Sequence, residues 1–219
     1  MKSMLEYLMA ANILVFGGSI TFGDYDKEGG WVNKLGSYFL VKTPRGKNRP
    51  TRVFNLSISG ETCGGVLKRL AMETRARHRK QHKLIYIFHI GLNDSILINR
   101  RAKIPSKVFG KSVIEIIKVC KKFTDKIIFL SPPPVDEKKV TPMPWSPNKY
   151  YYLDRILQYG KTIEQICKKY EADYIDLFKL LPIKKYIALL TDGVHPNSKG
   201  HEMIFEVVKN YLTEKNYMT

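Results

Sequence analysis

The chain has 219 residues, of which 44% are hydrophobic, which suits one globular α/β domain and excludes global disorder. Its 37 Lys and Arg residues outnumber 20 Asp and Glu residues. The formal net charge of +17 favours polyanions as partners, and it fits a lysine-rich solvated surface without such a partner equally well. No apolar run reaches the roughly 20 residues of a membrane-spanning helix. Glu6 interrupts what would be the apolar core of a signal peptide, so we expect a cytoplasmic protein. Residues 1–8 are expected to form a short helical or frayed lead-in.

Five short runs of β-branched and aliphatic residues alternate with stretches whose apolar residues recur at helical spacing. The runs lie at 12–16, 52–56, 84–89, 126–130 and 172–177, and a last helix is expected at 198–211. Nearly continuous apolar runs are typical of strands covered on both faces, and their alternation with helices indicates βαβ crossovers. We therefore expect residues 1–219 to form a single domain, a three-layer α/β/α sandwich around a five-stranded parallel sheet.

A serine follows the first expected strand in the run Gly17-Gly18-Ser19. Ligands of an open parallel sheet bind beyond the carboxyl ends of its strands, which is where this serine lies. Glycine lets a substrate approach the main chain closely, so Ser19 is a candidate nucleophile. The same residues also fit a plain glycine turn with a serine that caps a helix. The run lacks the Gly-Lys-Ser/Thr ending of a phosphate-binding loop.

Two further strand ends carry residues that suit an oxyanion. Gly60 follows the second strand, and its N–H is open to a developing negative charge. Asn93 follows the third strand in Gly91-Leu92-Asn93-Asp94, and its amide can donate hydrogen bonds without adding charge. Taken singly, the glycine also fits a simple turn and the asparagine an Asx-turn or helix cap. For Asp94 we expect the turn or capping role.

An acid and an imidazole stand three residues apart in Asp192-Gly193-Val194-His195-Pro196-Asn197. On a tight turn, the carboxylate can reach the Nδ1–H of His195 and leave Nε2 free as a base. Asn197 is expected to cap the helix that follows. An Asp-Gly turn with an exposed histidine fits the same residues equally well when the segment is taken alone.

Residues 131–148 contain prolines at six positions: 132, 133, 134, 142, 144 and 147. Such a run forbids helix, so we expect a stiff loop that leaves the carboxyl end of the fourth strand and forms part of the site rim. Met143 and Trp145 in this loop are expected to line the pocket for the acyl or alcohol part of a substrate.

The remaining cysteines and histidines are assigned to structure. Cys63, Cys120 and Cys167 are widely spaced and are expected to be reduced thiols, the latter two in the core and Cys63 partly accessible near the site. His89 is expected at the core or rim and His201 on the surface of the last helix. His78 and His82 have helical spacing but only basic neighbours, so no metal site is expected there.

Together these segments resemble the SGNH (GDSL-type) hydrolase family, whose members carry a serine after strand one, a glycine after strand two, G-x-N-D after strand three and D-x-x-H before the last helix. The motifs occur here in that order, with Gly18 where the family usually has an aspartate. The resemblance implies a flavodoxin-like fold and metal-free and cofactor-free hydrolysis of acyl esters or thioesters. It assigns Ser19, His195 and Asp192 to a catalytic triad, and Ser19, Gly60 and Asn93 to the oxyanion hole.

From this reading we expect a serine esterase for short acyl groups, such as acetyl esters of sugars or small alcohols, because no insertion is long enough for a large lid. Two alternatives remain open. One is a non-catalytic module that binds nucleic acid or another polyanion through its positive charge, although only 75–83 forms a dense basic cluster. The other is an acyltransferase that uses the same triad with an acceptor alcohol in place of water.

Overall fold

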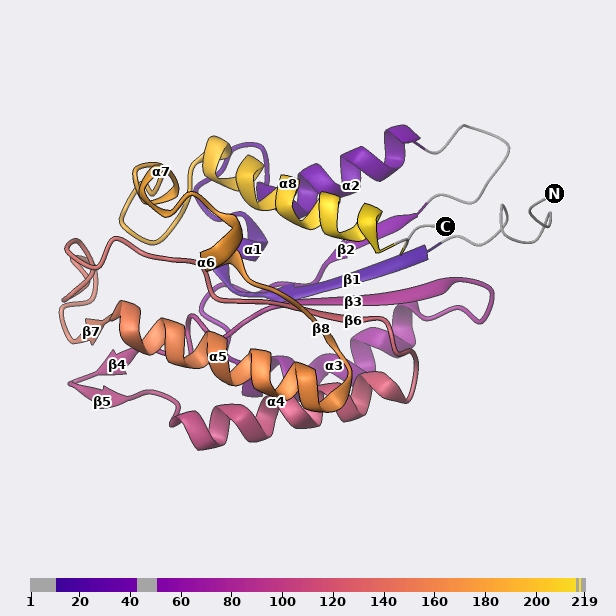
Figure 1. Cartoon of the computed structure of the whole chain (residues 1–219), viewed down its shortest axis with the longest axis horizontal. Helices are drawn as coiled ribbons and strands as arrows, with labels where there is room; N and C mark the ends of the chain where they lie inside the picture. The colour runs from indigo at the N-terminus through magenta and orange to yellow at the C-terminus, as the bar shows by residue number, and fades with distance from the viewer. Residues whose placement is uncertain (1–10, 43–50, 216, 218–219) are drawn as a thin grey trace.

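The computed structural model describes residues 11–42, 51–215 and 217 (Figure 1). The lead-in expected at residues 1–8 lies outside this part. A five-stranded parallel sheet has the strand order β2-β1-β3-β6-β8. Its strands are β1 (Ala11–Gly17), β2 (Arg52–Asn55), β3 (Lys83–His89), β6 (Ile127–Leu130) and β8 (Asp173–Ile175). The predicted five-stranded parallel sheet is thus confirmed, with the last strand shorter than expected.

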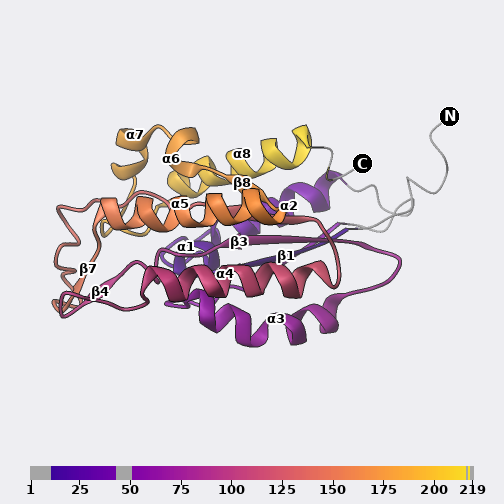
Figure 2. The ribbon, with the colours of Figure 1, turned by 60° about the horizontal axis from the view of Figure 1, so that its bottom comes forward.

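Helices cover both faces of this sheet (Figures 1 and 2). The long ones are α2 (Gly30–Lys42), α3 (Cys63–Arg77), α4 (Ser106–Lys121), α5 (Leu153–Tyr170) and α8 (Ser198–Glu214). Helix α2 packs against α8 on one face, while α4 packs against both α3 and α5 on the other. The short helices are α1 (Ser19–Phe22), α6 (Leu177–Leu180) and α7 (Ile183–Ile187). The predicted three-layer sandwich is confirmed.

The core divides into two clusters because strand side chains alternate between the faces. In β1, Ile13 and Val15 pack into the cluster beneath α2 and α8, whereas Leu14 and Phe16 pack into the cluster beneath α3 and α4. All four are fully buried. A strand covered on both faces has no polar side, which explains the unbroken apolar run in the sequence.

Helix α8 begins at the expected residue, but the burial of one of its side chains, His201, differs from the expectation. The side chain of Asn197 caps it by accepting hydrogen bonds from the backbone N–H groups of Lys199 and Gly200, each at 3.1 Å. The surface position expected for His201 is wrong, because this side chain is fully buried. Ile204 and Val208 follow it three and seven positions later, so His201 lies on the helical face that packs on the sheet.

A small antiparallel sheet, β5-β4-β7, was not predicted from the sequence. It joins β4 (Leu97–Ile98) and β5 (Arg101–Ala102) to β7 (Lys149–Tyr150), which follows the proline-rich loop. Strands of two residues carry no readable alternation, so the sequence gives no signal for them. This sheet joins the end of the proline-rich loop to the segment after β3.

No helix in the described part of the chain is long and apolar enough to cross a bilayer.

Candidate active site

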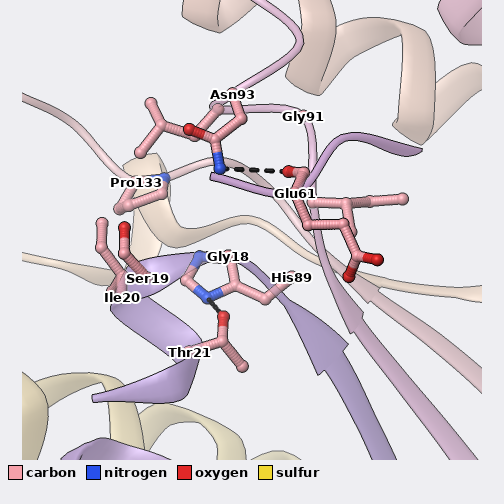
Figure 3. A pocket seen from close by; sticks show the side chains of 11 residues that line it. Gly18, Ser19, Ile20, Thr21, Glu61, His89, Gly91, Asn93 and Pro133 are labelled. Carbon is pink, nitrogen blue, oxygen red and sulfur yellow. Dashed lines mark hydrogen bonds between the residues drawn. The ribbon is translucent and has the colours of Figure 1, made fainter. Parts of the chain in front are cut away.

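Ser19 lies at the turn between β1 and α1, where the strand leads directly into the first helical residue. The turn is tight. A Cβ atom on Gly17 would lie 2.3 Å from Thr21 Oγ1 and 2.8 Å from the carbonyl oxygen of His89, so only glycine fits there. Thr21 Oγ1 also lies 3.0 Å from His89 Nδ1, and this contact attaches α1 to the end of β3 (Figure 3). The hydroxyl of Ser19 is therefore carried on a closely packed turn.

The structure brings Ser19, His195 and Asp192 together. His195 Nε2 lies 2.8 Å from Ser19 Oγ, and His195 Nδ1 lies 2.6 Å from Asp192 Oδ2. A carboxylate accepts hydrogen bonds, so Nδ1 carries the proton and Nε2 is free to accept one from the serine. The three side chains form a continuous chain of hydrogen bonds from two ends of the sequence.

Asp192 also holds the turn that carries His195. Its Oδ1 accepts hydrogen bonds from the backbone N–H groups of Val194 at 2.9 Å and His195 at 2.8 Å. Burial alone would raise the pKa of Asp192, but the hydrogen bonds from the ring and backbone of His195 outweigh it, and the pKa lies below its usual value. Asp192 is therefore a carboxylate at neutral pH, as an acceptor for Nδ1–H must be.

The proline-rich loop supports this turn from outside. The backbone N–H of Asp136 in this loop donates to the carbonyl of Gly193 at 2.8 Å. Within the turn itself, the backbone N–H of Thr191 donates to the carbonyl of His195 at 2.8 Å. Gly193 has φ of +91°, and a Cβ there would lie 2.9 Å from the Lys139 side chain. Glycine at 193 allows the loop and the turn to pack directly on each other.

Asn93 lies across from Ser19 (Figure 3). Its Nδ2 donates to the carbonyl oxygen of Glu61 at 3.1 Å (Figure 3), and the hydroxyl of Tyr151 donates to its Oδ1 at 3.4 Å. These contacts fix which end of the amide carries the protons. A primary amide has two N–H groups, so one remains available after the bond to Glu61. A Cβ on Gly18 would lie only 2.6 Å from Nδ2, so the amide occupies space that any other residue at 18 would fill.

A narrow cleft lies between Ser19 and Asn93. Gly18, Glu61, Asn93 and Pro133 are among its lining residues, and its free volume is about 20 Å³. A water molecule needs roughly 10–15 Å³ on this measure, so the cleft accepts a group of about that size. Gly60 directly precedes Glu61 in the turn after β2 and has φ of +77°, a conformation that favours glycine. Gly60 itself is not among the cleft residues.

The two expected pocket residues of the proline-rich loop have different surroundings. Trp145 is 52% exposed, and its ring centroid lies 6.5 Å from that of His195. Met143 is only 3% exposed and packs in the core beneath the loop, so its side chain does not line an open pocket. Tyr25, which sequence reasoning missed, lies closer still, with its ring centroid 5.0 Å from that of His195. Nothing in the sequence marks it, because it follows no strand end and belongs to no motif.

Cys63 and Asp94 form a buried pair behind the site. The expected partial exposure of Cys63 is wrong, since it is fully buried as the first residue of α3, and burial raises the pKa of its thiol. Asp94 accepts hydrogen bonds from the backbone N–H of Cys63 at 3.1 and 3.2 Å. Asp94 thus bonds to the amino end of α3 from the loop after β3. Burial raises the pKa of Asp94 to about 6 despite these bonds.

Cys120 and Cys167 are buried, as expected. Among the described residues, no three His, Cys, Asp or Glu side chains are grouped closely enough to hold a metal ion. The site itself presents a hydroxyl, an imidazole, a carboxylate and hydrogen-bond donors from the Asn93 amide and the main chain.

Comparison with known proteins gives a family and a fold. Residues 15–203 match the model of the GDSL-like lipase/acylhydrolase family. The structure resembles that of the lipase/acylhydrolase from Enterococcus faecalis (TM-score 0.70, 22% identity, 94% of this chain and 96% of that one). It also resembles the psychrotrophic esterase EstA from Pseudoalteromonas sp. (TM-score 0.69, 20% identity, 94% and 98%). A third similar structure is Axe2, an acetylxylan esterase from Geobacillus stearothermophilus (TM-score 0.66, 20% identity, 95% and 95%). No curated protein matches the sequence.

Proposed function

Because the chain belongs to the GDSL-like lipase/acylhydrolase family, we propose that it hydrolyses esters of short acyl groups, with Ser19 as the nucleophile. Membership makes the chain a carboxylic ester hydrolase. The hydrogen-bonded series from Ser19 through His195 to Asp192 is the observation that carries the assignment of roles. Each side chain lies within hydrogen-bonding distance of the next, which is what proton transfer during acylation needs.

In the proposed mechanism His195 Nε2 accepts the proton of the Ser19 hydroxyl as the serine oxygen attacks the ester carbonyl. The imidazolium that forms is stabilised by the Asp192 carboxylate at 2.6 Å from Nδ1. His195 then gives its proton to the leaving alcohol, and an acyl-serine remains. Water attacks the acyl-serine by the same route in reverse, with His195 as the base, and releases the acid.

The tetrahedral intermediate carries a negative oxygen that needs donors. We assign this role to the backbone N–H groups of Ser19 and Gly60 and to the second N–H of the Asn93 amide. Asn93 suits it because its first N–H is bound to Glu61 and its orientation is fixed before substrate arrives. Donors that need no reorganisation stabilise the transition state more than the substrate.

The size of the cleft supports the preference for short acyl groups. Its free volume of about 20 Å³ leaves room for only a small group beside Ser19, and a long acyl chain has no enclosed path there. The acetylxylan esterase among the similar structures agrees with this preference but does not define the alcohol. The three cysteines are free thiols buried in the described chain, which suits the proposed cytoplasmic location.

The test combines labelling with a substrate series. A fluorophosphonate should label the native protein and should not label Ser19→Ala, while Ser112→Ala, at a partly exposed serine on α4, serves as the matched control. Hydrolysis of p-nitrophenyl esters should be fastest with acetate and fall as the acyl chain lengthens. Unchanged labelling of Ser19→Ala would refute the nucleophile. A preference for long chains would refute the short-acyl specificity, and salt-sensitive nucleic-acid binding without esterase activity would favour a binding module.

A further inference from the structure

Two large aromatic side chains stand exposed beside His195. Tyr25 comes from the segment between α1 and α2, and Trp145 comes from the proline-rich loop. Tyr25 is 76% exposed and Trp145 52% exposed, although both rings lie against the same imidazole. Most exposed aromatics need no special explanation, but two from separate loops that meet at one candidate catalytic histidine form a shared surface.

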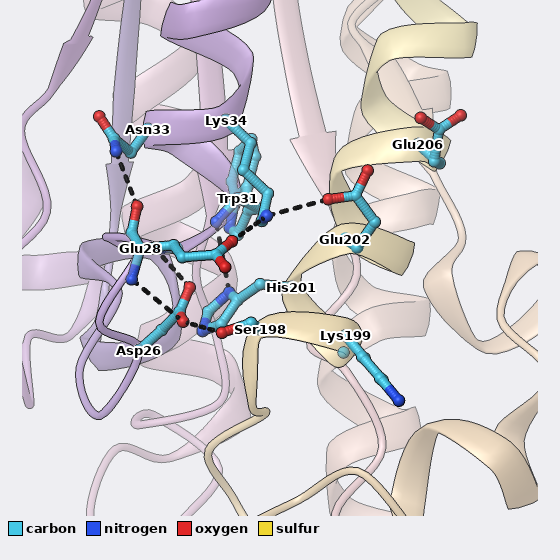
Figure 4. A network of polar contacts seen from close by, with 12 residues as sticks. Asp26, Glu28, Trp31, Asn33, Lys34, Ser198, Lys199, His201, Glu202 and Glu206 are labelled. Carbon is cyan, nitrogen blue, oxygen red and sulfur yellow. Dashed lines mark hydrogen bonds and ion pairs between the residues drawn. The ribbon is translucent and has the colours of Figure 1, made fainter.

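The segment that carries Tyr25 is a closed and well-anchored loop. A Cβ on Gly23 would lie 2.6 Å from the carbonyl of Gly29, so the two ends of the loop are in direct contact. Asp26 in its middle accepts hydrogen bonds from the backbone N–H of Gly30 at 2.9 Å and from the hydroxyl of Ser198 at the start of α8 (Figure 4). Tyr25 is thus presented from a fixed support.

Tyr25 itself has φ of +63°, in the left-handed region that a bulky residue seldom adopts. Such a conformation costs free energy and is retained only where the surrounding structure requires it. Here the ring lies beside His195 while most of the side chain remains exposed. The strained backbone of Tyr25 therefore positions its side chain beside His195.

Trp145 is supported in a similar way. It lies in a hydrogen-bonded turn in which the N–H of Ser146 donates to the carbonyl of Met143 at 3.2 Å, and that of Met143 donates to the carbonyl of Lys149 at 2.9 Å. The buried Met143 side chain anchors this turn in the core. Met143 is thus a support for Trp145.

We propose that Tyr25 and Trp145 form the binding site for the alcohol part of the ester, and that this alcohol is a sugar ring. The proposal rests on the proposed function and deepens it. The C–H groups on one face of a sugar carry partial positive charge from the neighbouring oxygens, and they are attracted to the negative face of an aromatic ring. Two exposed rings next to the group that protonates the leaving alcohol are placed to bind such a face.

The surrounding polar groups favour a neutral, hydroxyl-rich ligand. Asp24, next to Tyr25, accepts a hydrogen bond from the Ser59 hydroxyl at 2.5 Å, and both residues are on the outer side of the loops. Sugar hydroxyls can donate to the Asp24 carboxylate, whereas this carboxylate would repel a phosphate group. A lipid tail would need an enclosed apolar channel, and the cleft at Ser19 is too small for one.

The experiment compares two esters that each carry one acetyl group and differ in the alcohol, a methyl mono-O-acetyl-xylopyranoside and ethyl acetate, by titrating the released acid. We expect Tyr25→Ala and Trp145→Ala each to lower kcat/KM for the acetylated sugar by about 10-fold or more, mainly through KM, and to change that for ethyl acetate by less than about 3-fold. Tyr25→Phe, which keeps the ring face, should restore the sugar ester. Leu40→Ala on α2, 66% exposed, is the control for loss of a large exposed side chain.

The outcomes separate this proposal from the proposed function. If native protein hydrolyses ethyl acetate and is labelled at Ser19 but shows no gain with the acetylated sugar, the sugar site is refuted and the esterase stands. Equal losses on both esters would also refute it, because the rings would then act by positioning His195. Absence of hydrolysis of both esters together with absence of Ser19 labelling would refute the esterase itself.

Discussion

The two sides of the candidate site are held in different ways. On one side, Ser19, His195 and Asp192 are joined by short hydrogen bonds of 2.8 and 2.6 Å between groups that change charge during the proposed reaction. On the other side, Asn93 is a neutral amide held by longer contacts of 3.1 and 3.4 Å to Glu61 and Tyr151.

Space differs between the two sides as well. The triad side is filled, since the turn at Gly193 packs directly on the proline-rich loop. The Asn93 side depends on the absence of a side chain at Gly18, because Nδ2 lies only 2.6 Å from the position that a Cβ on residue 18 would take. A change in a proton-transfer group typically lowers kcat more than the loss of one oxyanion donor does. Substitutions on the two sides should therefore differ in size and in kind.

The largest effect is expected for Asp192→Asn. The Oδ1 of asparagine can still accept from the N–H groups of Val194 and His195, so the turn is preserved. Its NH₂ group would face His195 Nδ1 and favour the tautomer with the proton on Nε2, which cannot accept from Ser19. We expect kcat for p-nitrophenyl acetate to fall about 10⁴-fold with little loss of thermal stability. A variant that keeps more than a tenth of native kcat would contradict the role of Asp192.

Asn93→Ala tests the other side and should be milder. Loss of one preorganised oxyanion donor typically lowers kcat by about 10²–10³-fold, and labelling of Ser19 should continue at a reduced rate. Asn33→Ala, which removes an exposed amide bonded to the carbonyl of Glu28, is the control. A change in KM with an unaltered kcat would show that Asn93 binds the ground state and does not serve the transition state.

Gly18→Ala sharpens the comparison by leaving every proposed catalytic group in place. The backbone at Gly18 is extended (φ −97°, ψ −154°), so alanine can be accommodated, but its Cβ must displace the Asn93 amide. We expect kcat to fall about 10-fold, and the double variant with Asn93→Ala to lose less than the sum of the two single effects. Gly64→Ala in α3, where a Cβ meets nothing within 4 Å, is the matched control. Additive losses would show that residue 18 does not act through Asn93.

The smallest effect is expected on the pH dependence of stability, to which His89, buried at the end of β3, contributes. Burial lowers the pKa of His89 to about 3 and that of His201 to about 4, and raises that of Asp94 to about 6. Between about pH 4.5 and 5.5, unfolding adds protons to both histidines and removes one from Asp94. The net uptake is about one proton, so stability should fall by up to about 1.4 kcal/mol for each unit of acidification.

Urea unfolding at pH 6.5 and 5 measures this dependence. The histidine contribution is present above their unfolded pKa near 6.5 and is lost as the pH falls towards their folded values. Asp94 acts in the opposite sense, since its raised pKa favours the folded protein at low pH. Asp94→Asn removes that opposing contribution and should make the decline steeper. Stability that rises on acidification over this range would contradict the assignment.

Local pattern was sufficient for the architecture. The strand runs at 12–16 and 84–89 are apolar on both faces because helices cover both faces, and this burial is visible in the sequence without any knowledge of partners. The cap at Asn197 was equally predictable, since it depends on residues within one helical turn. The family motifs at Ser19, Asn93 and His195 were likewise readable, because each follows or precedes a regular element at a fixed offset.

Relations between distant residues were decided only by the tertiary structure. His201 was assigned to the surface and Cys63 to partial exposure because burial of one helical position depends on what packs against it. The approach of Asn93 to Gly18 and the meeting of Tyr25 and Trp145 at His195 join loops far apart in sequence. The sequence by itself determined which elements form and in which order. The positions of loop side chains were left to the packing of the whole chain, because no local periodicity or capping rule constrains them.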